Sequence, residues 1–495
     1  MNAIPSPSPQ PRFTPGRARI LAVRWALWLA ALGSLVILWG ALCTVPGLQW
    51  NPPRFAPSYA LAEGLNIYAT RASGAHLGWF YGPVFALWGV PAAWVPQITW
   101  SFMVWALLNY VAIFGPVWLV LRDVAGEFRS AFAGCALFAV LLLANAITQS
   151  LVFVIHVDGL CVGLGTLACW SLGRAAAGRG GRFLHLAAVA VVLAVWTKQV
   201  AVSLVPGIFL WLWWTRQTRF MPTLFLWLVV YGGLITAGFF LWFGGEELLF
   251  NLWLVHAQNP RKGGWPLLGT EMGRMVSTAV VWWVATLLVL LARRPSALES
   301  TSGPLMRKLL GCVALCHLPL GLTAVLKAGG GLNSMHSLNY LLLLLVLGLL
   351  PLLRPAAAGV ERASGVGRLG AGWGLLAVVG LGLGVAFHHA GKMNAQWLPY
   401  RGQEKMLATA RASAGHIYFP WNPLLTLVTD RKVYPFDDAL YCLHLARLAP
   451  SMAAVRAAVP PGAILYYEEP VQSCFALNYF PEFRAGPRLP VGGKP

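Results

Sequence analysis

Charged residues are scarce in this 495-residue chain: Asp, Glu, Lys and Arg make up 11% of it, and only 16 residues are acidic. Soluble globular domains are about 25% charged, so this value excludes most soluble classes. The 36 basic residues do not indicate a nucleic-acid binder, because such proteins cluster their bases on a water-exposed face. Since 58% of the residues are hydrophobic, we expect an all-α polytopic membrane protein that sits in a lipid bilayer and binds no nucleic acid.

Cysteine is scarce as well. Six of the eight cysteines lie in or near apolar runs, where packing in lipid explains them. Cys442 and Cys474 lie outside those runs, and a disulfide between them is an option in an oxidising compartment.

Long apolar runs divide the first 387 residues. Runs of about 17 to 25 residues cross a bilayer as helices, whose backbone groups are satisfied internally. Three shorter runs each continue an apolar stretch and are also counted as spans. The eleven predicted spans are 20–45, 98–121, 131–154, 159–173, 183–197, 200–214, 221–243, 276–292, 309–326, 337–353 and 369–387.

Lys and Arg gather in alternate gaps between these runs. Cytoplasmic segments of membrane proteins carry an excess of Lys and Arg, so these gaps are predicted to be cytoplasmic. The six segments hold 18 basic and four acidic residues, and they are the N-terminus, 122–130, 174–182, 215–220, 293–308 and 354–368. Most of the formal charge of +20 is therefore an orientation signal.

The alternation also decides how a twelfth apolar stretch is interpreted. If the N-terminus and 122–130 are both inside, an even number of spans separates them, and 20–45 and 98–121 supply two. The stretch 80–95, interrupted by Pro83 and Pro91, must then not cross. We predict interfacial or re-entrant helices there, within a long outer loop over 46–97.

Three regions follow from this pattern. Residues 1–19 are predicted as a disordered cytoplasmic N-terminus, and the run after them is too long, with no evident cleavage site, for a signal peptide. Residues 20–387 form the multi-span membrane domain. Residues 388–495 contain more polar residues and short alternating runs, which predict a small α/β domain on the outer side. In this tail, Asp437 and Asp438 are expected to form a solvated surface.

Unusual polar residues concentrate in the segments predicted to lie outside. Ionisable groups at membrane depth are costly and are by default functional candidates. Asp158 is the first catalytic candidate and Glu63 the second. The simpler explanation for Asp158 is that it caps a helix, and for Glu63 that it faces water on a loop helix. The predicted substrate-binding residues are Tyr68, His156, Lys198, Gln199, His256, Arg261, Lys262, Lys327, Asn333 and His336.

These residue types suit a reaction at a lipid-linked phosphate. A carboxylate can remove a proton from a polar acceptor, and cations can neutralise a phosphate leaving group. For Lys198 the simpler explanation is an ammonium that reaches the headgroups, and for Arg261 and Lys262 it is contact with lipid headgroups.

Several short motifs resemble the C-type (GT-C) integral-membrane glycosyltransferases, the superfamily of protein mannosyltransferases and the aminoarabinose transferase. They are Gly64-x-x-x-Tyr68 followed by Tyr81-Gly82-Pro83, His156-Val157-Asp158-Gly159-Leu160, Thr197-Lys198-Gln199, Lys327-Ala328-Gly329-Gly330 with Asn333, and Tyr418-Phe419-Pro420-Trp421-Asn422-Pro423. The resemblance covers most of 20–387 and adds Tyr81 to the substrate-binding residues.

The resemblance implies a polyprenyl-phosphate sugar donor, inverting transfer and, in some members, a divalent metal such as Mg²⁺ or Mn²⁺ near the acids. It also implies an acidic base close to the end of the first span. The stretch 51–59 contains no acid, and Glu63 is the nearest one. The catalytic base is therefore Glu63 or Asp158, or this protein has an altered or inactive site.

We therefore expect a glycosyltransferase that moves a hexosyl or pentosyl group from a polyprenyl-phosphate carrier to a lipid, glycan or protein acceptor. It would act at the outer face of a bacterial inner membrane, with a cytoplasmic N-terminus and a periplasmic C-terminal domain. A transporter or flippase is the alternative from another class. A polymerase or ligase of lipid-linked glycans also fits, because such enzymes rely on outer-loop arginines and Arg54, Arg71 and Arg261 are present.

Overall fold

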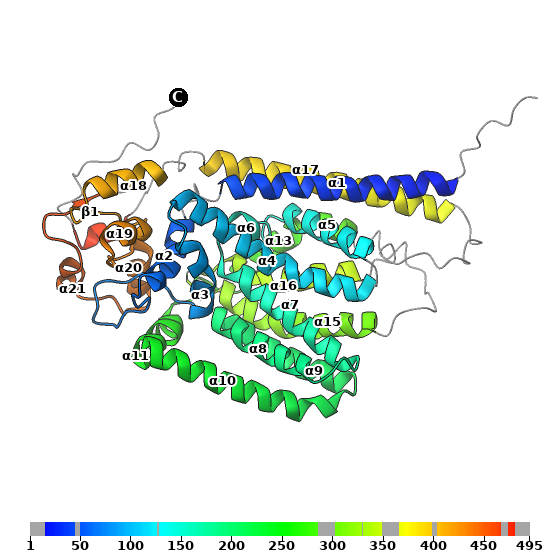
Figure 1. The fold of residues 1–495 in the computed structure, drawn as a ribbon, viewed down its shortest axis with the longest axis horizontal. Helices are drawn as coiled ribbons and strands as arrows, with labels where there is room; N and C mark the ends of the chain where they lie inside the picture. The colour runs from blue at the N-terminus through cyan, green and yellow to red at the C-terminus, as the bar shows by residue number, and fades with distance from the viewer. Residues whose placement is uncertain are drawn as a thin grey trace, which may run out of the picture.

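Helices make up almost all of the regular structure. The computed structural model describes residues 15–44, 50–125, 128–285, 302–328, 330–348, 366–397, 403–466 and 474–480. The longer helices lie side by side along the long axis of the molecule, and a C-terminal domain covers one end of them (Figure 1). The predicted all-α membrane fold with a small α/β C-terminal part is confirmed, and the outer position of that part remains a prediction.

Among the described residues, five helices are long and apolar enough to cross a membrane. They are α1 (Pro15–Thr44), α4 (Ile98–Ala125), α10 (Met221–Phe243), α15 (Ser302–Val325) and α17 (Val366–Trp397). Shorter or less apolar helices complete the bundle: α5 (Phe128–Ala144), α6 (Ser150–Phe153), α7 (Val157–Ala176), α8 (Arg182–Thr197), η2 (Gln199–Ser203) with α9 (Leu204–Trp214), and α16 (His336–Gly348). This is a multi-pass membrane protein, and the total of eleven spans remains a prediction.

The helix positions follow the predicted runs closely, with three differences. The predicted span 131–154 is interrupted after Ala144, where α5 ends, and α6 begins only at Ser150. Helix α1 begins at Pro15, inside the segment expected to be disordered, and residues 1–14 lie outside the described part of the chain. The predicted span 276–292 begins at the end of α13 (Trp265–Thr278) and continues as helix to residue 285, beyond which the chain is not described until residue 302.

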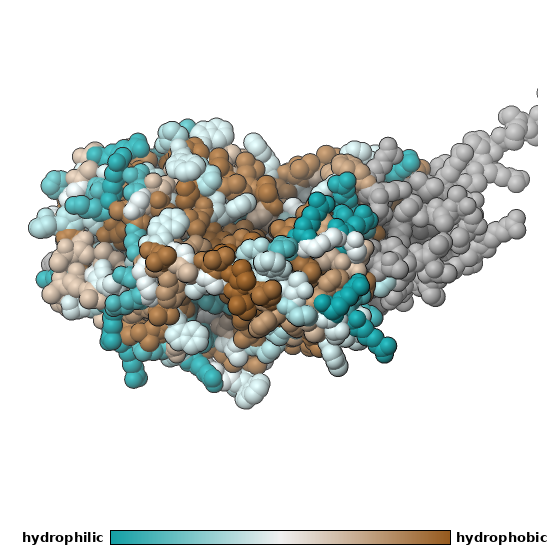
Figure 2. Space-filling view, turned by 60° about the horizontal axis from the view of Figure 1, so that its bottom comes forward, coloured by the Kyte–Doolittle hydropathy of each residue, from teal (hydrophilic) through white to brown (hydrophobic). Residues whose placement is uncertain are grey.

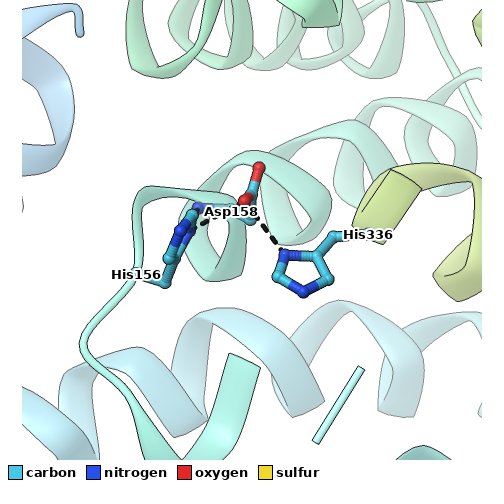
Figure 3. A group of neighbouring side chains, drawn as sticks. All are labelled: His156, Asp158 and His336. Carbon is cyan, nitrogen blue, oxygen red and sulfur yellow. Dashed lines mark hydrogen bonds and ion pairs between the residues drawn. The ribbon is translucent and has the colours of Figure 1, made fainter. Parts of the chain in front are cut away.

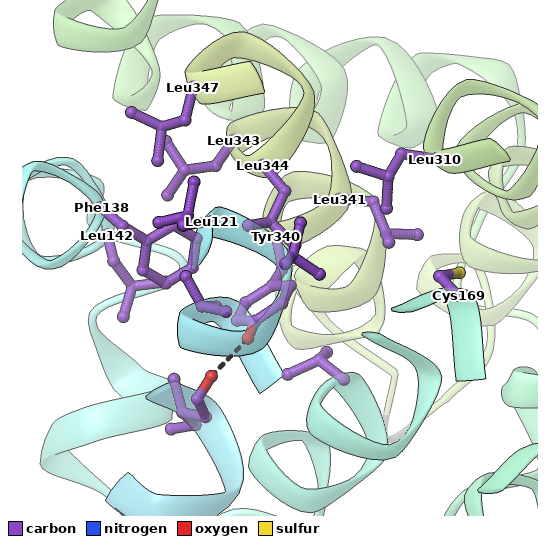
Figure 4. Packing of buried hydrophobic residues seen from close by; sticks show 14 of the residues in the cluster. Leu121, Phe138, Leu142, Cys169, Leu310, Tyr340, Leu341, Leu343, Leu344 and Leu347 are labelled. Carbon is purple, nitrogen blue, oxygen red and sulfur yellow. Dashed lines mark hydrogen bonds between the residues drawn. The ribbon is translucent and has the colours of Figure 1, made fainter. Parts of the chain in front are cut away.

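Close backbone approach holds the bundle together. A Cβ on Gly163 of α7 would lie 2.0 Å from the carbonyl oxygen of Ala112 of α4, so only glycine fits there. Small residues at such crossings are the usual means by which membrane helices pack. Nearby, the buried Tyr340 hydroxyl donates to the carbonyl oxygen of Ile113 at 2.5 Å, amid Phe138 and several leucines (Figure 4).

The first outer loop forms two short helices, as predicted. Helix α2 (Asn51–Ala62) packs on α3 (Pro83–Ala93), and each has proline in its first turn, where a missing N–H costs nothing. At 11 residues α3 is about 16 Å long, too short to cross a bilayer of about 30 Å. The stretch 80–95 is therefore not a span.

Other short elements link the spans at their ends. They are η3 (Thr218–Phe220), α11 (Gly245–Leu249), the π-helical η4 (Phe250–Leu254), α12 (Val255–Gln258) and η5 (Leu332–Met335). On the molecular surface, hydrophobic residues cover the middle of the face shown, and hydrophilic residues gather at the end that carries the C-terminal domain (Figure 2). Such an apolar band between polar ends fits a bilayer.

The C-terminal domain is a small α/β unit, as predicted, and the membrane helix before it runs to Trp397. Its single described sheet pairs β1 with β2 in parallel, with Ile417 opposite Ile464. The elements in order are α18 (Gln403–Ala412), β1 (Ile417–Tyr418), α19 (Pro423–Asp430), α20 (Asp437–Leu445), α21 (Met452–Ala457), β2 (Ile464–Leu465) and η8 (Phe475–Asn478).

This domain docks on the first outer loop. The backbone N–H of Phe436 donates to the carbonyl oxygen of His76 at 2.9 Å, immediately before α20 begins. A Cβ on Gly78 would lie 2.9 Å from the Ala439 side chain, so α20 approaches the loop closely. Helix α20 thereby comes to lie against the segment that leads to Tyr81.

The expectation of a solvated Asp437 is wrong. Asp437 is only 2% exposed, because its carboxylate accepts the backbone N–H of Ala476 at 2.6 Å and the thiol of Cys474 at 3.1 Å. These two bonds tie α20 to η8 and stabilise the domain core. Cys442 and Cys474 are both free thiols here, so the optional disulfide is not formed.

Candidate active site

The first turn of α7 is the centre of the site. His156 is its N-cap, and the ring Nδ1 accepts the backbone N–H of Asp158 at 3.2 Å. Asp158 is therefore not the cap, but it stands in the first turn, where the helix dipole stabilises a carboxylate. Gly159 leaves room for Asn109 of α4, because a Cβ there would lie 2.1 Å from the Asn109 side-chain oxygen.

Three side chains converge on the Asp158 carboxylate, and Figure 3 shows two of them, His156 and His336. Lys198, between α8 and η2, places Nζ 2.6 Å from Oδ1. His156 and His336 place their Nδ1 atoms 2.7 and 3.0 Å from Oδ2. The Asn333 amide lies 3.2 Å from Nε2 of His156. Five predicted site residues thus form one cluster, which we call the Asp158 cluster.

This cluster is almost completely buried. Asp158 and His336 are each 1% exposed, and Lys198 is 7% exposed. A buried charge is tolerated only when it is paired and hydrogen-bonded, as Asp158 and Lys198 are here. Since both carboxylate oxygens are engaged, Asp158 is a weak proton acceptor and is better suited to hold Lys198 in place.

Arg54 of α2 was not among the predicted site residues and was named only in support of the polymerase or ligase alternative. Its guanidinium donates to the carbonyl oxygen of Ile155 at 3.3 Å and lies over the Trp50 ring. Burial lowers the pKa of Arg54, and the nearby Tyr81, Asp158 and Asp438 oppose that shift. Arg54 therefore adds a second cation beside the Asp158 cluster. The signal in the sequence was a lone arginine in the stretch where an acid was expected.

Asp438 of α20 brings a carboxylate from the C-terminal domain. Burial, then the neighbouring Asp437, raise the pKa of Asp438 to about 6, and Arg54 opposes the shift. Among the described residues, the bond recorded for its carboxylate is a weak one from the Cys442 thiol at 4.0 Å. Asp438 also acts electrostatically on Tyr81. This acid therefore lies within electrostatic reach of the site, and its carboxylate has fewer bonding partners than that of Asp158.

A second group of predicted site residues binds backbone carbonyls. Gln199 donates to the carbonyl oxygens of Phe80 at 3.2 Å and Leu252 at 3.4 Å, and His256 Nε2 lies 2.7 Å from that of Phe80. These contacts fix the outer segments around the site rather than offering free donors.

Lys327 and Lys262 are engaged in the same way. Lys327 Nζ donates to the His256 carbonyl oxygen at 2.8 Å, and Lys262 Nζ to that of Gly330 at 2.5 Å. Arg261 and Lys327 form an isolated antiparallel bridge between their backbones. Gly329, part of the predicted motif, lies outside the described residues.

The remaining predicted residues lie in the first outer loop. The Tyr68 hydroxyl donates to the carbonyl oxygen of Tyr81 at 2.7 Å, which sets the position of the Tyr81 ring beside Lys198, Arg54 and Asp158. Glu63 follows α2, and its carboxylate pairs with the exposed Arg431 of the C-terminal domain at 3.4 Å. The structure does not place Glu63 among the side chains that contact Asp158.

A cavity of about 270 Å³ opens next to this loop. It is lined by loop residues between Asn66 and Leu77, together with Glu247 of α11 and Val433 of the C-terminal domain. Tyr68 also lines it. The cavity is thus bounded by the same two parts of the molecule that supply Tyr81 and Asp438.

Of the comparisons with known proteins, only the one with solved structures finds similar chains. No protein-family model matches the chain, and no curated protein matches it significantly. Among solved structures, ArnT from Cupriavidus metallidurans bound to undecaprenyl phosphate aligns over 93% of this chain and 95% of its own, with a TM-score of 0.58 and 13% identity. The chain has the fold of this ArnT. The apo structure of the same ArnT aligns over the same shares at 14% identity with a TM-score of 0.44.

This shared fold agrees with the resemblance drawn from the short motifs. It extends over the C-terminal domain as well as the membrane domain, because the aligned share is 93% of the chain. The resemblance covered most of 20–387 and one motif of the tail, 418–423, so the alignment extends it over more of the C-terminal domain. At 13% identity the likeness establishes the fold, and the chemistry has to be argued from the residues present.

Proposed function

We propose that this protein transfers a sugar from a polyprenyl-phosphate carrier to an acceptor hydroxyl. The observation that carries the proposal is the buried convergence of Lys198, His156, His336 and Arg54 around Asp158, at the end of a GT-C bundle covered by the C-terminal domain. The ArnT structure with this fold is bound to undecaprenyl phosphate, which supports the same class of carrier here.

Lys198 and Arg54 are the proposed contacts of the carrier phosphate. Both are cations in surroundings of low dielectric constant, where they stabilise a departing phosphate more than in water. Asp158 holds the Lys198 ammonium through its Oδ1, so the cation is positioned before substrate binds. Lys262 and Lys327 are assigned to fixing the outer segments, because their ammonium groups already bind carbonyl oxygens.

Asp438 is the proposed general base. Its pKa of about 6 keeps it ionised at neutral pH and close to the range in which a base works best. The acceptor oxygen would attack the anomeric carbon while the carbon–oxygen bond to the phosphate breaks. The acceptor proton would go to Asp438, and polyprenyl phosphate would leave. Attack opposite the leaving group inverts the anomeric configuration.

The acceptor is proposed to enter from the cavity beside the first outer loop. Its position between that loop and Val433 gives the C-terminal domain a part in orienting the acceptor. We propose a lipid, glycan or protein acceptor and a hexosyl or pentosyl group. The distribution of Lys and Arg supports a bacterial inner membrane with the N-terminus in the cytoplasm and the C-terminal domain in the periplasm.

Release of polyprenyl phosphate from a labelled polyprenyl-phosphate sugar by the purified protein tests the proposal. We expect Asp438→Asn to lower kcat by about 10²- to 10⁴-fold, the usual contribution of a general base. Glu63→Gln tests the base expected from the sequence. Glu404→Gln is the matched control, because this exposed acid contacts only the Thr99 segment among the described residues. Unchanged turnover in Asp438→Asn would exclude it as the base.

Labelling of single introduced cysteines tests the sidedness and the transporter alternative together. A cysteine at Ser413, in the C-terminal domain, should react with an impermeant reagent added from outside, and one at Gly180, in the α7–α8 turn, should not. The reverse pattern would place the Asp158 cluster on the cytoplasmic side. Transport of an intact lipid-linked sugar without release of polyprenyl phosphate would favour a flippase.

A further inference from the structure

We propose that His156, Asp158 and His336 form a binding site for one divalent transition-metal ion of the Zn²⁺ class. The candidate ligand atoms, one from each residue, all lie within 4.8 Å of one another. All three side chains are buried, and they come from the start of α7 and the start of α16 (Figure 3).

The distances within the cluster fit such an ion after a small expansion. The Nδ1 atoms of His156 and His336 lie 2.7 and 3.0 Å from the same oxygen, Oδ2 of Asp158. Ligands at about 2.0 to 2.1 Å in tetrahedral arrangement are roughly 3.4 Å apart. Shifts of less than about 1 Å in each pair would therefore open the cluster to the ion.

The surroundings of His336 fit a metal ligand that coordinates through Nδ1. Its Nε2 lies 2.9 Å from the Ser150 hydroxyl and 3.0 Å from the carbonyl oxygen of Ile147, which can only accept, so Nε2 carries a proton. Nδ1 hydrogen-bonds to Oδ2 of Asp158, and an ion would take the place of the proton in that bond. Metal-binding histidines usually donate their other N–H to a carbonyl or carboxylate in this way.

His156 shows the same arrangement on the other side. Its Nδ1 accepts the backbone N–H of Asp158 through its lone pair and lies 2.7 Å from Oδ2, so an ion bound at Nδ1 would replace the hydrogen bond from that N–H. Its Nε2 lies 3.2 Å from the Asn333 amide, which can offer its oxygen to an N–H at Nε2. An ion held between the two Nδ1 atoms and Oδ2 would replace the hydrogen bonds and ion pairs that the two imidazoles otherwise make with Asp158.

Lys198 does not occupy the proposed site. Its ammonium binds Oδ1, the other carboxylate oxygen, and leaves Oδ2 to the two imidazoles. Two imidazoles and one carboxylate suit Zn²⁺, whereas the Mg²⁺ or Mn²⁺ suggested by the resemblance prefers oxygen ligands. When bound, the ion would add fixed positive charge beside Lys198. That last role rests on the proposed function, whereas binding of the ion does not.

Metal binding to the full-length, tag-free protein in detergent tests the site directly. After EDTA treatment the protein is titrated with Co²⁺ or Zn²⁺, and bound metal is measured by elemental analysis and by the visible absorption of Co²⁺. We expect one ion per chain, with affinity at least tenfold lower in His336→Asn. His317→Asn is the matched control, because His317 is equally buried but its Nδ1 contacts Ser203 instead.

A second variant keeps the test meaningful if His336→Asn fails to fold. His336→Cys places a thiolate near the ion, and the longer bond to sulfur, about 2.3 Å, compensates for the shorter side chain. It should restore binding and add a sulfur-to-cobalt charge-transfer band in the near ultraviolet. Equal metal content in wild type and His336→Asn, or a missing band in folded His336→Cys, would overturn the proposal. Release of polyprenyl phosphate by the metal-free protein would support the proposed transferase activity independently of the metal site.

Discussion

The ammonium of Lys198 lies 2.6 Å from Oδ1 of Asp158, although 40 residues separate the two in the sequence. This ion pair joins the end of α8 to the start of α7, at the end of the bundle that the C-terminal domain covers (Figure 1). Both side chains are buried, so water screens their attraction little. The pair therefore fixes a cation where the proposed carrier phosphate would bind.

Breaking this pair should be strongly destabilising. Asp158→Asn leaves the Lys198 ammonium buried without its counter-charge, which typically costs about 3 to 5 kcal/mol. Lys198→Met should cost a similar amount. The double variant Asp158→Asn/Lys198→Met should be more stable than the sum of the two single losses predicts, because no unpaired charge is left. Unfolding of the detergent-solubilised variants, followed by intrinsic fluorescence, gives the four values of the cycle.

A second aspartate pair provides the control for this cycle. Asp123 of α4 binds Arg174 of α7, and both side chains are about one quarter exposed. Screening by solvent should reduce the loss in Asp123→Asn to about 1 kcal/mol or less. If Asp123→Asn destabilised the protein as much as Asp158→Asn, burial would not explain the importance of the Lys198 pair.

Glycine at the α4–α7 crossing allows a second prediction. Gly163→Ala introduces a methyl group 2.0 Å from the Ala112 carbonyl oxygen, a backbone atom that cannot move aside. The helices must separate, at a cost of about 1 to 3 kcal/mol. Gly115→Ala of α4 is the control, because nothing lies within 4 Å of its added methyl group. We expect Gly115→Ala to melt at or above the wild-type temperature, and equal effects of both variants would argue against the close crossing.

Much of the fold could be predicted because a bilayer imposes simple rules. Runs of apolar residues and alternate basic gaps predicted helices such as α4, α10 and α15, and parity excluded a span at 80–95. The same rules predicted the first and last residues of helices less well. Helix α1 begins at Pro15 despite a polar start, because proline is tolerated in a first helical turn.

The site was predicted only in part. Asp158, His156, Lys198, Asn333 and His336 could be grouped, because lone polar residues between apolar runs are costly and unusual. Their roles could not be separated, since pairing depends on distances that a sequence does not contain. Asp438 was assigned to solvent because an acid in a polar tail resembles a surface residue, and only the docking of α20 on the segment 76–80 shows otherwise.

The cysteines of the C-terminal domain lead to a third prediction. The Cys474 thiol donates to Asp437, and Cys442 lies next to Asp438 on the following turn of α20. Both are free thiols, and burial, followed by the neighbouring carboxylates, raises their pKa, which slows oxidation because less thiolate is present. Alkylation after unfolding without reductant should modify both residues, as seen by peptide mass spectrometry. A peptide pair linked through Cys442 and Cys474 would contradict the free thiols.

Asp438 gives the last prediction, which concerns pH. Its pKa in the folded protein is about 6, whereas the ordinary value is 3.8, so the folded state binds its proton more tightly than the unfolded state. The associated stability is fully present below about pH 4 and is lost as the pH rises through about 6. Two pKa units correspond to at most about 3 kcal/mol.

Asp438→Asn should therefore unfold at a higher temperature than wild type at pH 8 and at the same temperature near pH 4. The measurement is the difference between the two melting curves from pH 4 to pH 8, which cancels other titrating groups such as His76. Parallel curves would show that burial does not oppose ionisation of Asp438. A variant that is more stable but lacks turnover would show that the acid is retained for chemistry, because residues needed only for stability do not give that combination.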